Sequence, residues 1–194
     1  NEVKQTKVTQ SEFSLKVDNW NVSITNPDKI YWPEEKITKY DMLDYYIKMS
    51  DYMLSYLKNR PESLLRHPNG IHADSFYQKD QENLPDYIES TVVASKSSEK
   101  TINYLLCQNR ATLLYMNNLG CIEIHPWHST IFNLDNPDYA IIDLDPSAEN
   151  TFEQVIETAL VVKAVLDRAK IRGFCKTSGA SGLHIYIPMG GQYS

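Results

Sequence analysis

Two aspartates separated by one residue stand at the end of an apolar run. The run is Tyr139–Leu144, and the acids are Asp143 and Asp145. Side chains two positions apart on a β-strand share one face, so we expect both carboxylates to point the same way. Like charges this close repel each other, so either one carboxylate takes a proton or a divalent cation bridges the two. Oxygen donors favour Mg²⁺ or Mn²⁺ over zinc. The alternative is a structural pair that caps the turn before the next helix.

Two histidines follow an earlier predicted strand at Cys121–His125. They are His125 and His128, on either side of Pro126-Trp127. No paired cysteines and no HExxH pattern accompany them, so the sequence does not support a zinc site. A histidine beside a phosphate group is the functional interpretation, and an ordinary loop histidine is the alternative.

A turn of small residues, 178–182, separates two predicted strands, Phe174–Thr177 and His184–Pro188. Glycine and alanine let backbone N–H groups approach an anion closely. Ser178 adds a hydroxyl donor, and His184 adds an imidazole. The segment lacks the Gly-Lys-Ser/Thr ending of a Walker loop. The alternative is a simple hairpin turn.

Cations occur beside aromatic residues and beside a helix start in the first half of the chain. Arg66 and the segment Phe76–Lys79 combine charge with aromatic rings, a combination that suits phosphates and a stacked base. Lys29, Lys36 and Lys39 flank a predicted helix start, where free N–H groups favour anions. The alternative in both places is a core aromatic residue with solvated cations.

Two amphipathic helices and several strands must position these residues. The first helix is predicted over 38–58, with Thr38 and Asp41 as a capping box. Its expected buried stripe comprises Met42, Tyr45, Tyr46, Met49, Tyr52, Met53, Tyr56 and Leu57. The second is predicted over Thr151–Ile171, with Thr151 and Gln154 as its capping pair. Its expected inner face includes Phe152, Val155, Ile156, Ala159, Leu160, Val162 and Leu166.

A shorter helix is predicted at Asn109–Asn118, ending at Gly120. Further strands are predicted at Trp20–Thr25, Ser63–Arg66 and Thr91–Ser95. Strands and helices alternate only in part. The sequence therefore predicts the α+β class, with a mixed or mostly antiparallel sheet flanked by helices.

Composition restricts the class of protein. The chain has 194 residues, of which 42% are hydrophobic and 23% charged, as in ordinary globular proteins. No apolar run approaches the roughly 20 residues that span a bilayer, and the N-terminus shows no signal-peptide pattern. We therefore expect a cytoplasmic protein without a membrane partner. Cys107, Cys121 and Cys175 are widely spaced, which predicts buried free thiols.

The net charge of −6 argues against a nucleic-acid binder, but the charge is unevenly distributed. Residues 1–110 carry 14 Lys and Arg against 16 Asp and Glu, whereas residues 111–194 carry 5 against 9. A bound divalent cation would offset part of the C-terminal charge. A local basic groove in the first half therefore remains compatible with the composition.

Taken in order, the motifs resemble the polymerase domain of bacterial DNA ligase D, a branch of the archaeo-eukaryotic primase superfamily. The resemblance begins near Thr25 and runs to the C-terminus. We therefore divide the chain into a leader with a first strand, residues 1–24, and a polymerase domain, residues 25–194. The motifs are Asn26-Pro27-Asp28-Lys29, Thr38-Lys39, Arg66-His67-Pro68-Asn69-Gly70, Phe76-Tyr77-Gln78-Lys79, Ile122–Trp127, Asp143-Leu144-Asp145-Pro146 and Thr177–His184.

The resemblance implies a primase-like core and template-directed nucleotidyl transfer. The family extends primers and fills gaps, prefers ribonucleotides and uses Mn²⁺ or Mg²⁺ at a two-metal site. It acts on DNA ends with Ku and a ligase module in non-homologous end joining, which places it in the bacterial cytoplasm and at the nucleoid during repair. By resemblance, the roles are catalysis and metal binding for Asp143 and Asp145, nucleotide binding for His125, Ser178, Gly179 and His184, templating-base contact for Phe76, 5′-phosphate binding for Lys29 and Lys39, and nucleotide or DNA contact for Arg66 and Lys79.

Two departures from the family pattern matter. Ser181 stands where the family often has a basic residue, so one phosphate contact is expected to be weaker. The family's third metal carboxylate lies beyond Ser194, so we expect this chain to be the N-terminal part of the domain, inactive by itself. Two alternatives stay open: a non-catalytic module that binds DNA ends with a 5′-phosphate, and a metal-dependent phosphoesterase that activates water.

Overall fold

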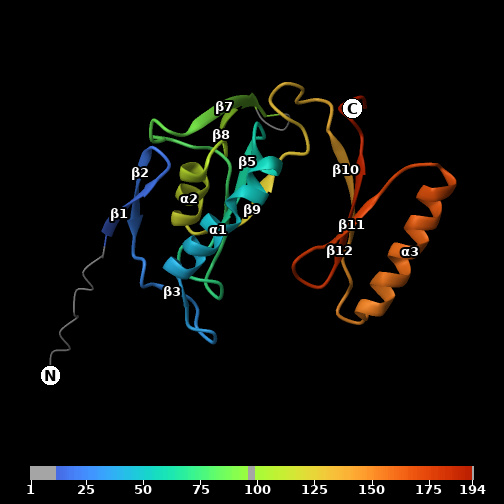
Figure 1. Cartoon of the computed structure of the whole chain (residues 1–194). Helices are drawn as coiled ribbons and strands as arrows, with labels where there is room; N and C mark the ends of the chain where they lie inside the picture. The colour runs from blue at the N-terminus through green and yellow to red at the C-terminus, as the bar shows by residue number, and fades with distance from the viewer. Residues whose placement is uncertain (1–11, 96–98, 194) are drawn as a thin grey trace. The chain divides into compact units, whose positions relative to one another are not determined.

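The computed structural model describes residues 12–95 and 99–193 (Figure 1). Within these ranges the chain has three helices and twelve strands, and every strand pair is antiparallel. The predicted α+β class is therefore confirmed. The elements form two compact units: unit 1 ends at Trp127, and unit 2 begins at His128.

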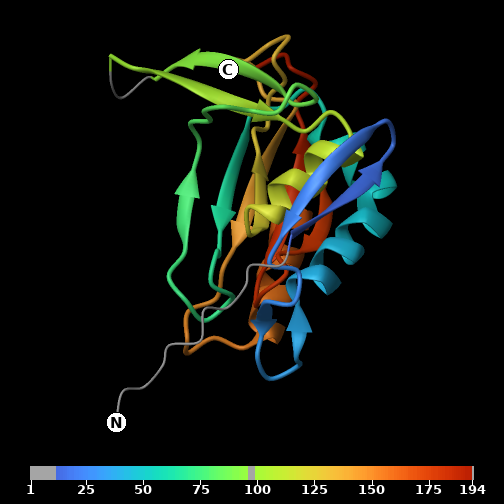
Figure 2. The same ribbon diagram turned by 90° about the vertical axis from the view of Figure 1, so that its left-hand side faces the viewer.

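Unit 1 is built from short antiparallel sheets around two helices. The strand pairs are β1 (Glu12–Val17) with β2 (Trp20–Thr25), β3 (Ile30–Trp32) with β4 (Ile37–Thr38), and β7 (Glu89–Ala94) with β8 (Thr101–Leu106). A three-stranded sheet has the order β6 (Phe76–Gln78), β5 (Glu62–Arg66), β9 (Cys121–Pro126). The helices are α1 (Lys39–Leu57) and α2 (Arg110–Asn118), and the β1–β2 hairpin lies beside them in both views (Figures 1 and 2).

The start of α1 follows from its sequence. The Thr38 hydroxyl accepts a hydrogen bond from the Asp41 amide, and the Asp41 carboxylate accepts one from the Thr38 amide. The predicted capping box is therefore confirmed, as is the second one at Thr151 and Gln154. The third predicted helix start is also confirmed, because the Asn109 side chain accepts from the Thr112 amide.

The buried face of α1 differs from the predicted stripe. Tyr45, Tyr52 and Tyr56 are exposed, whereas Leu43 and Ser50 are buried. Ser50 lies at the helix–helix contact, where its hydroxyl accepts a hydrogen bond from Nε of Arg110 on α2. A small residue there allows α2 to approach, while the three tyrosines keep their hydroxyls in solvent. The inner face is therefore rotated away from the tyrosines.

Unit 1 has two adjoining hydrophobic clusters. The first joins the β1–β2 hairpin to both helices and contains Val17, Val22, Ile24, Tyr31, Met42, Leu43, Ala111 and Leu114. The second joins the helices to the β6–β5–β9 sheet and contains Leu57, Leu64, Ile88, Leu105, Cys107, Leu113, Met116 and Cys121. These clusters hold β5 and β9 against the helices and so fix the strands that carry Arg66 and His125.

Unit 2 is a three-stranded sheet with one helix. Its strand order is β10 (Tyr139–Leu144), β12 (Leu183–Pro188), β11 (Phe174–Thr177). Helix α3 (Phe152–Arg168) packs on the side of the sheet that carries Leu183 and Ile185. Glu153 lies in the first turn of α3 and Arg168 in its last turn, as the helix dipole favours.

Two predictions for unit 2 were wrong. Within α3 only Val155 and Leu166 are buried, whereas Phe152, Ile156 and Leu160 are exposed, because the apolar face of the helix is wider than its contact with the small sheet. Cys175 is exposed because β11 is an outer strand that α3 covers only in part, while Cys107 and Cys121 are buried free thiols as predicted.

Several short strands were not predicted, namely β1, β3, β4, β6 and β8. The predicted leader falls largely on residues 1–11, which lie outside the described residues. The treatment of residues 25–194 as one domain stays a prediction. None of the three helices in the described ranges combines the length and apolar character needed to cross a membrane.

One carboxyl group is buried in the core of unit 1. Glu62 on β5 is fully buried, and no hydrogen-bond partner is found for either carboxylate oxygen among the described residues. Burial raises the pKa of Glu62 well above its ordinary value, and the charge of Arg60 offsets only part of this effect. The folded chain therefore holds a proton on Glu62 at pH values where the unfolded chain has released it.

We predict that this proton makes the chain less stable as the pH rises. Above about pH 4.3, the ordinary glutamate pKa, the folded state binds more protons than the unfolded state, so the free energy of unfolding falls with rising pH until the raised pKa is passed. Urea unfolding at pH 5 and pH 8 measures this change. The free energy of unfolding should fall less between the two pH values for Glu62→Gln than for the parent. The exposed Glu82→Gln serves as control, and a fall of equal size in Glu62→Gln would refute the prediction.

Candidate active site

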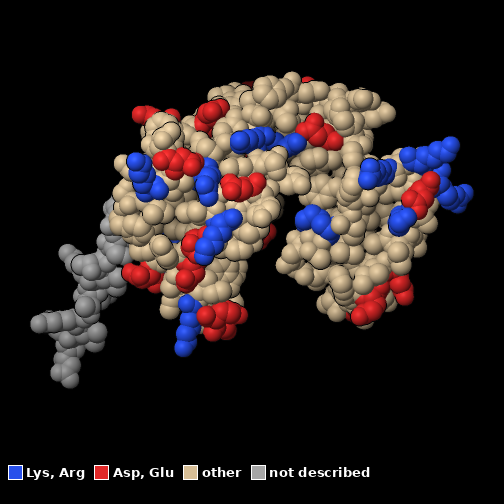
Figure 3. All heavy atoms as spheres, viewed as in Figure 1, with Lys and Arg blue, Asp and Glu red and all other residues tan. Residues whose placement is uncertain are grey.

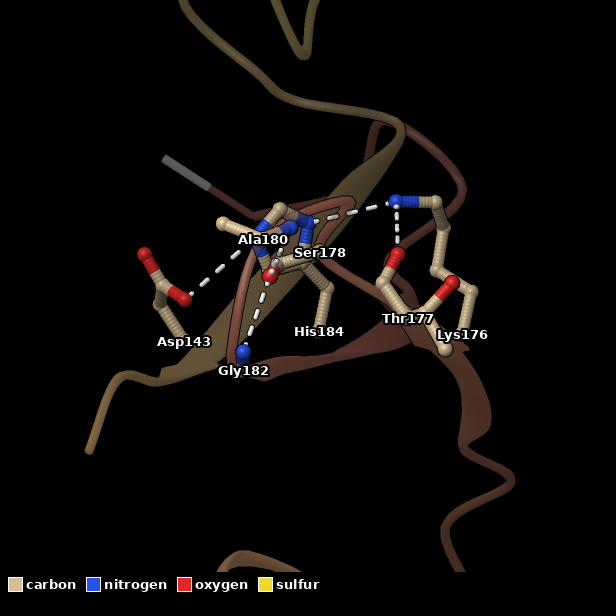
Figure 4. Close-up of polar contacts among 7 residues, drawn as sticks. All are labelled: Asp143, Lys176, Thr177, Ser178, Ala180, Gly182 and His184. Carbon is tan, nitrogen blue, oxygen red and sulfur yellow. Dashed lines mark hydrogen bonds and ion pairs between the residues drawn. The ribbon is translucent and has the colours of Figure 1, made fainter. Parts of the chain in front are cut away.

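The centre of the site in unit 2 is a cross-strand pair of an acid and a histidine. Asp143 on β10 is paired directly with His184 on β12. The His184 Nε2 atom lies 3.3 Å from an Asp143 carboxylate oxygen (Figure 4). The Asp143 side chain remains half exposed, so its oxygens are available to another group.

Asp145 follows directly after β10, two residues beyond Asp143. Both residues line a cavity of about 260 Å³, together with Pro146 and Asn150 from the loop before α3 and Gln154 from the first turn of α3. This arrangement is the one expected for side chains at positions i and i+2 of a strand. Two carboxylates therefore open into one polar cavity.

The predicted turn between β11 and β12 is closed by the Ser178 side chain. The Ser178 hydroxyl oxygen accepts hydrogen bonds from the Ala180 amide at 3.3 Å and from the Gly182 amide at 3.0 Å (Figure 4). These two amides are therefore occupied, and the hydroxyl hydrogen of Ser178 remains as a donor. Gly179 is exposed, with a positive φ of 105° and open space around it.

Gly182 allows this turn to approach the acidic strand. A Cβ atom at this position would lie 2.5 Å from the carbonyl oxygen of Leu144 and 2.8 Å from a carboxylate oxygen of Asp145. Both distances are too short for a side chain. Glycine at position 182 therefore brings Ser178 and the end of β10 together.

Sequence reasoning did not assign a role to Lys176, which the structure places in the same site. Its ammonium group lies 3.5 Å from His184 Nδ1 and donates to the carbonyl oxygen of Thr177 at 2.7 Å (Figure 4). The two strands pair Lys176 with His184. The signal in the sequence is the alternation that places residues 174 and 176 on one face of β11, but it requires the register between strands.

The donors of this site fit a hard divalent cation in chemical type. Asp143 and Asp145 offer carboxylate oxygens, which suit Mg²⁺ or Mn²⁺. In the described ranges, no group of three or more His, Cys, Asp or Glu side chains converges to hold a metal ion. Within these ranges the site therefore offers two carboxylates to a cation.

Unit 1 holds a separate cluster of cations. Lys29 donates to the Pro68 carbonyl at 2.6 Å and to the Asn69 side chain at 2.7 Å. Lys39 is buried, with only 4% of its surface exposed, and donates to the Thr25 carbonyl at 2.6 Å. Burial, with the nearby charges of Lys29 and Arg66, lowers the pKa of Lys39 to about 8. Lys29 and Arg66 are thus close enough to Lys39 to disfavour its charge, and a bound anion would offset this repulsion.

The helix start beside this cluster does not offer free N–H groups. The Lys39 amide donates to the Lys29 carbonyl, the Tyr40 amide to the Pro27 carbonyl and the Asp41 amide to the Thr38 hydroxyl. The idea that anions bind to these amides was wrong, because the chain itself already satisfies them. Side-chain cations must therefore carry any anion binding here, and Lys36 lies exposed in the β3–β4 turn.

The β6–β5–β9 sheet separates the remaining candidates in unit 1. The Arg66 guanidinium lies 5.1 Å from the centre of the Phe76 ring, and the two residues are paired across β5 and β6. The Tyr77 ring lies 5.5 Å from that of His125 on β9. Because side chains alternate along β6, Phe76 and Tyr77 point to opposite faces. Lys79 is exposed just after β6.

The predicted site residues therefore fall into two groups. Unit 2 brings together the acid pair, the turn and the paired histidine, namely Asp143, Asp145, Ser178, Gly179 and His184. Unit 1 contains the cation cluster and the aromatic groups, namely Lys29, Lys39, Arg66, Phe76, Lys79 and His125. Tyr77 was quoted only as part of a motif, and the β5–β6 register reveals its position beside His125.

These features define a class of α+β domain that carries an acidic pair at the edge of a small antiparallel sheet. Residues 38–194 match the family described as the LigD primase-polymerase domain. The chain therefore belongs to this family, and the resemblance drawn from the motifs is confirmed.

Known relatives agree with this assignment. A bifunctional non-homologous end joining protein LigD from Bacillus subtilis is 34% identical over 169 residues, which cover 87% of this chain and 26% of that protein. A multifunctional LigD from Pseudomonas aeruginosa is 28% identical, over 87% of this chain and 20% of that protein. A solved polymerase domain of Mycobacterium tuberculosis ligase D, in complex with DNA, has a TM-score of 0.79 and 29% identity, over 87% of this chain and 61% of that one.

The lowered pKa of Lys39 predicts a stability that rises at alkaline pH. Between about pH 8 and the ordinary lysine pKa of 10.5, the folded chain binds fewer protons than the unfolded chain, so the free energy of unfolding increases with pH in that window. Urea unfolding from pH 7 to pH 10 should show this contribution in the parent but not in Lys39→Met. The exposed Lys36→Met is the matched control, and identical pH profiles for Lys39→Met and the parent would contradict the assignment.

The close approach at Gly182 predicts a local effect of adding a methyl group. Gly182→Ala should force the turn away from Leu144 and Asp145, at a cost of roughly 1–3 kcal/mol. Hydrogen exchange of the β10 and β12 amides measures this directly, and we expect faster exchange in both strands. Ser181→Ala, at an exposed neighbouring position, should leave the exchange unchanged. Equal protection in the two variants would show that the contact does not constrain the turn.

Proposed function

We propose that the domain to which this chain belongs adds nucleotides to DNA ends, under the direction of a template, in non-homologous end joining. The observation that carries the proposal is the pair Asp143 and Asp145, which share one cavity beside His184 in a chain of the LigD primase-polymerase family. The chain spans about a fifth to a quarter of the length of the curated relatives it matches. Ku, the ligase module and the bacterial cytoplasm and nucleoid are parts of the same proposal.

In the proposed reaction a primer 3′-hydroxyl attacks the α-phosphorus of a nucleoside triphosphate, and pyrophosphate leaves in line with the attack. Asp143 and Asp145 would hold Mg²⁺ or Mn²⁺, which lowers the cost of negative charge on the attacking and leaving oxygens. The Ser178 hydroxyl has its oxygen occupied by two amides, so it donates its hydrogen to a phosphate oxygen. His184 contacts the same group, and Gly179 leaves the turn open to it.

The residues of unit 1 would bind the DNA and the nucleotide. Lys29 and Lys39 grip a 5′-phosphate, since the mutual repulsion of the cation cluster is relieved by an anion. Phe76 stacks against the templating base, with Arg66 held beside its ring. His125 contacts the triphosphate, and Lys79 contacts the nucleotide or the DNA. A preference for ribonucleotides and for Mn²⁺ follows only from the family resemblance.

A second candidate function is DNA-end binding without catalysis. It is favoured by the contrast between the two groups of residues: the cation cluster of unit 1 has its charges assembled, whereas the described residues bring only two carboxylates together in unit 2. Binding that requires a 5′-phosphate but leads to no turnover would support it. A phosphoesterase would instead shorten the primer.

We predict that Asp143→Ala abolishes primer extension while DNA binding remains. The assay uses a gapped template with a downstream 5′-phosphate, Mn²⁺ and ribonucleotides, and the protein that contains this chain. The loss should be at least about 10³-fold, since the carboxylate acts on charge that develops in the transition state. Asp167→Asn is the control, because Asp167 on α3 pairs with Lys163 at 2.5 Å, away from the cavity.

Two outcomes would contradict this proposal. Extension by Asp143→Ala would show that Asp143 has another role. A primer that becomes shorter would favour the phosphoesterase. The same assay on the 194-residue chain tests the expectation that it is inactive by itself.

A further inference from the structure

Lys176 occupies a position that the functional assignments above leave unexplained. It lies on the outer strand β11, paired with His184, and His184 is paired on its other side with Asp143. Asp143, His184 and Lys176 therefore form one row across the sheet, with the imidazole between the carboxylate and the ammonium group. Neighbouring strands lie about 4.8 Å apart, so the row extends over roughly 10 Å.

The ammonium group of Lys176 is directed to this face of the sheet. It lies 3.5 Å from His184 Nδ1 (Figure 4). It also lies 6.0 Å from the centre of the Tyr186 ring. The neighbouring residue Cys175 points to the opposite face, where it lines a cavity with α3. The alternation of β11 thus places the lysine with the acid pair and keeps it away from the helix.

The charge of Lys176 is not neutralised by a carboxylate in the described residues, where its polar partners are the Thr177 carbonyl and His184. Two other cations of unit 2 contact groups outside the site. Lys163 pairs with Asp167 at 2.5 Å, and Arg172 lies over the Phe174 ring. Figure 3 shows that the basic side chains of this unit gather toward the end of α3. Lys176 is therefore the cation that contacts the site residues in this part of the chain.

We propose that Lys176 binds the distal phosphates of the triphosphate whose reacting end lies at Asp143 and Asp145. The inference rests on the proposed function and adds a residue to it. An ammonium group carries three donors, of which the Thr177 carbonyl takes one, so donors remain for phosphate oxygens. A polyphosphate laid along the row would have its cation-binding end at the acids and its far end at Lys176.

Lys176 also orients His184. Its ammonium group can only donate, so the 3.5 Å contact makes Nδ1 of His184 the acceptor. The other ring nitrogen, Nε2, then carries the hydrogen and faces Asp143 at 3.3 Å. Lys176 thereby acts as a positioning residue for the imidazole as well as a ligand for phosphate.

The test measures binding of inorganic tripolyphosphate to the 194-residue chain in the presence of Mg²⁺, by calorimetry. Lys176→Met should raise the Kd roughly tenfold or more, the usual effect of losing a charge-assisted hydrogen bond. Lys176→Arg keeps a cation and should restore most of the affinity. Lys163→Met removes a lysine of the same unit that pairs on α3, and we expect no change.

A second measurement separates phosphate binding from a merely structural role. The imidazole NMR signals of His184 should move in Lys176→Met before any ligand is added, and Lys176→Arg should keep them near their parent positions. Orthophosphate, which is too short to extend along the row, should bind with a Kd that depends less on Lys176 than that of tripolyphosphate. An unchanged Kd for tripolyphosphate in Lys176→Met, or no binding by the parent chain, overturns the proposal.

Failure of this inference can be told apart from failure of the proposed function. Primer extension with an unchanged KM for the nucleotide in Lys176→Met would remove Lys176 from the site and leave the polymerase function intact. If tripolyphosphate binding depends on Lys176 but the protein extends no primer, the role of Lys176 stands and the polymerase function fails. A raised KM with little change in kcat supports both.

Discussion

The antiparallel register of β10 and β12 is the constraint on which the site in unit 2 depends. Side chains alternate along a strand, so a shift of one residue would move Asp143 to the face that α3 covers and bring an apolar neighbour opposite His184. The register is held by the alternation itself, because Leu183 and Ile185 are buried on the α3 side while His184 and Tyr186 lie on the other. Burial of the apolar face therefore determines where the acid and the histidine meet.

The turn before β12 depends on the same register. Gly182 comes close to the Leu144 carbonyl and to Asp145 only because β12 starts opposite the end of β10. Ser178 then closes the loop through two amide hydrogen bonds. The same strand pairing therefore positions both the acid pair and the serine turn. Preorganisation of this kind is what charge stabilisation at a phosphate requires.

Unit 1 shows what buried ionisable groups contribute to stability and to binding. Glu62 lacks a hydrogen-bond partner in the described residues, and burial raises its pKa, which favours the neutral form. Lys39 keeps a backbone acceptor, but its pKa is lowered by burial and by neighbouring cations. The charged form of such a lysine destabilises the free protein, and a bound anion would offset this destabilisation. A chain with a net charge of −6 can therefore still present a local cation cluster.

Local patterns in the sequence were sufficient for the fold class and the helix starts. Thr38 with Asp41 and Thr151 with Gln154 define their caps within four residues, so no distant information is needed. Burial was harder to predict, because it depends on partners elsewhere in the chain. The tyrosines of α1 fit a helical stripe, yet the contact with Arg110 of α2 selects the face that carries Ser50. The prediction that free amides at the helix start bind an anion was wrong, because the carbonyls of Pro27 and Lys29 accept hydrogen bonds from two of those amides.

Lys176 illustrates the remaining gap between sequence and site. Its separation of eight residues from His184 in the sequence does not predict a contact between the two side chains, because a hairpin of another length would place them apart. Only the pairing of β11 with β12 places an ammonium beside the imidazole that faces Asp143. Motifs therefore identify the residues that lie on one strand or one turn, while contacts across strands require the register. Because the acid, the imidazole and the ammonium come from three strands, the chemistry of this site belongs to the sheet as a whole.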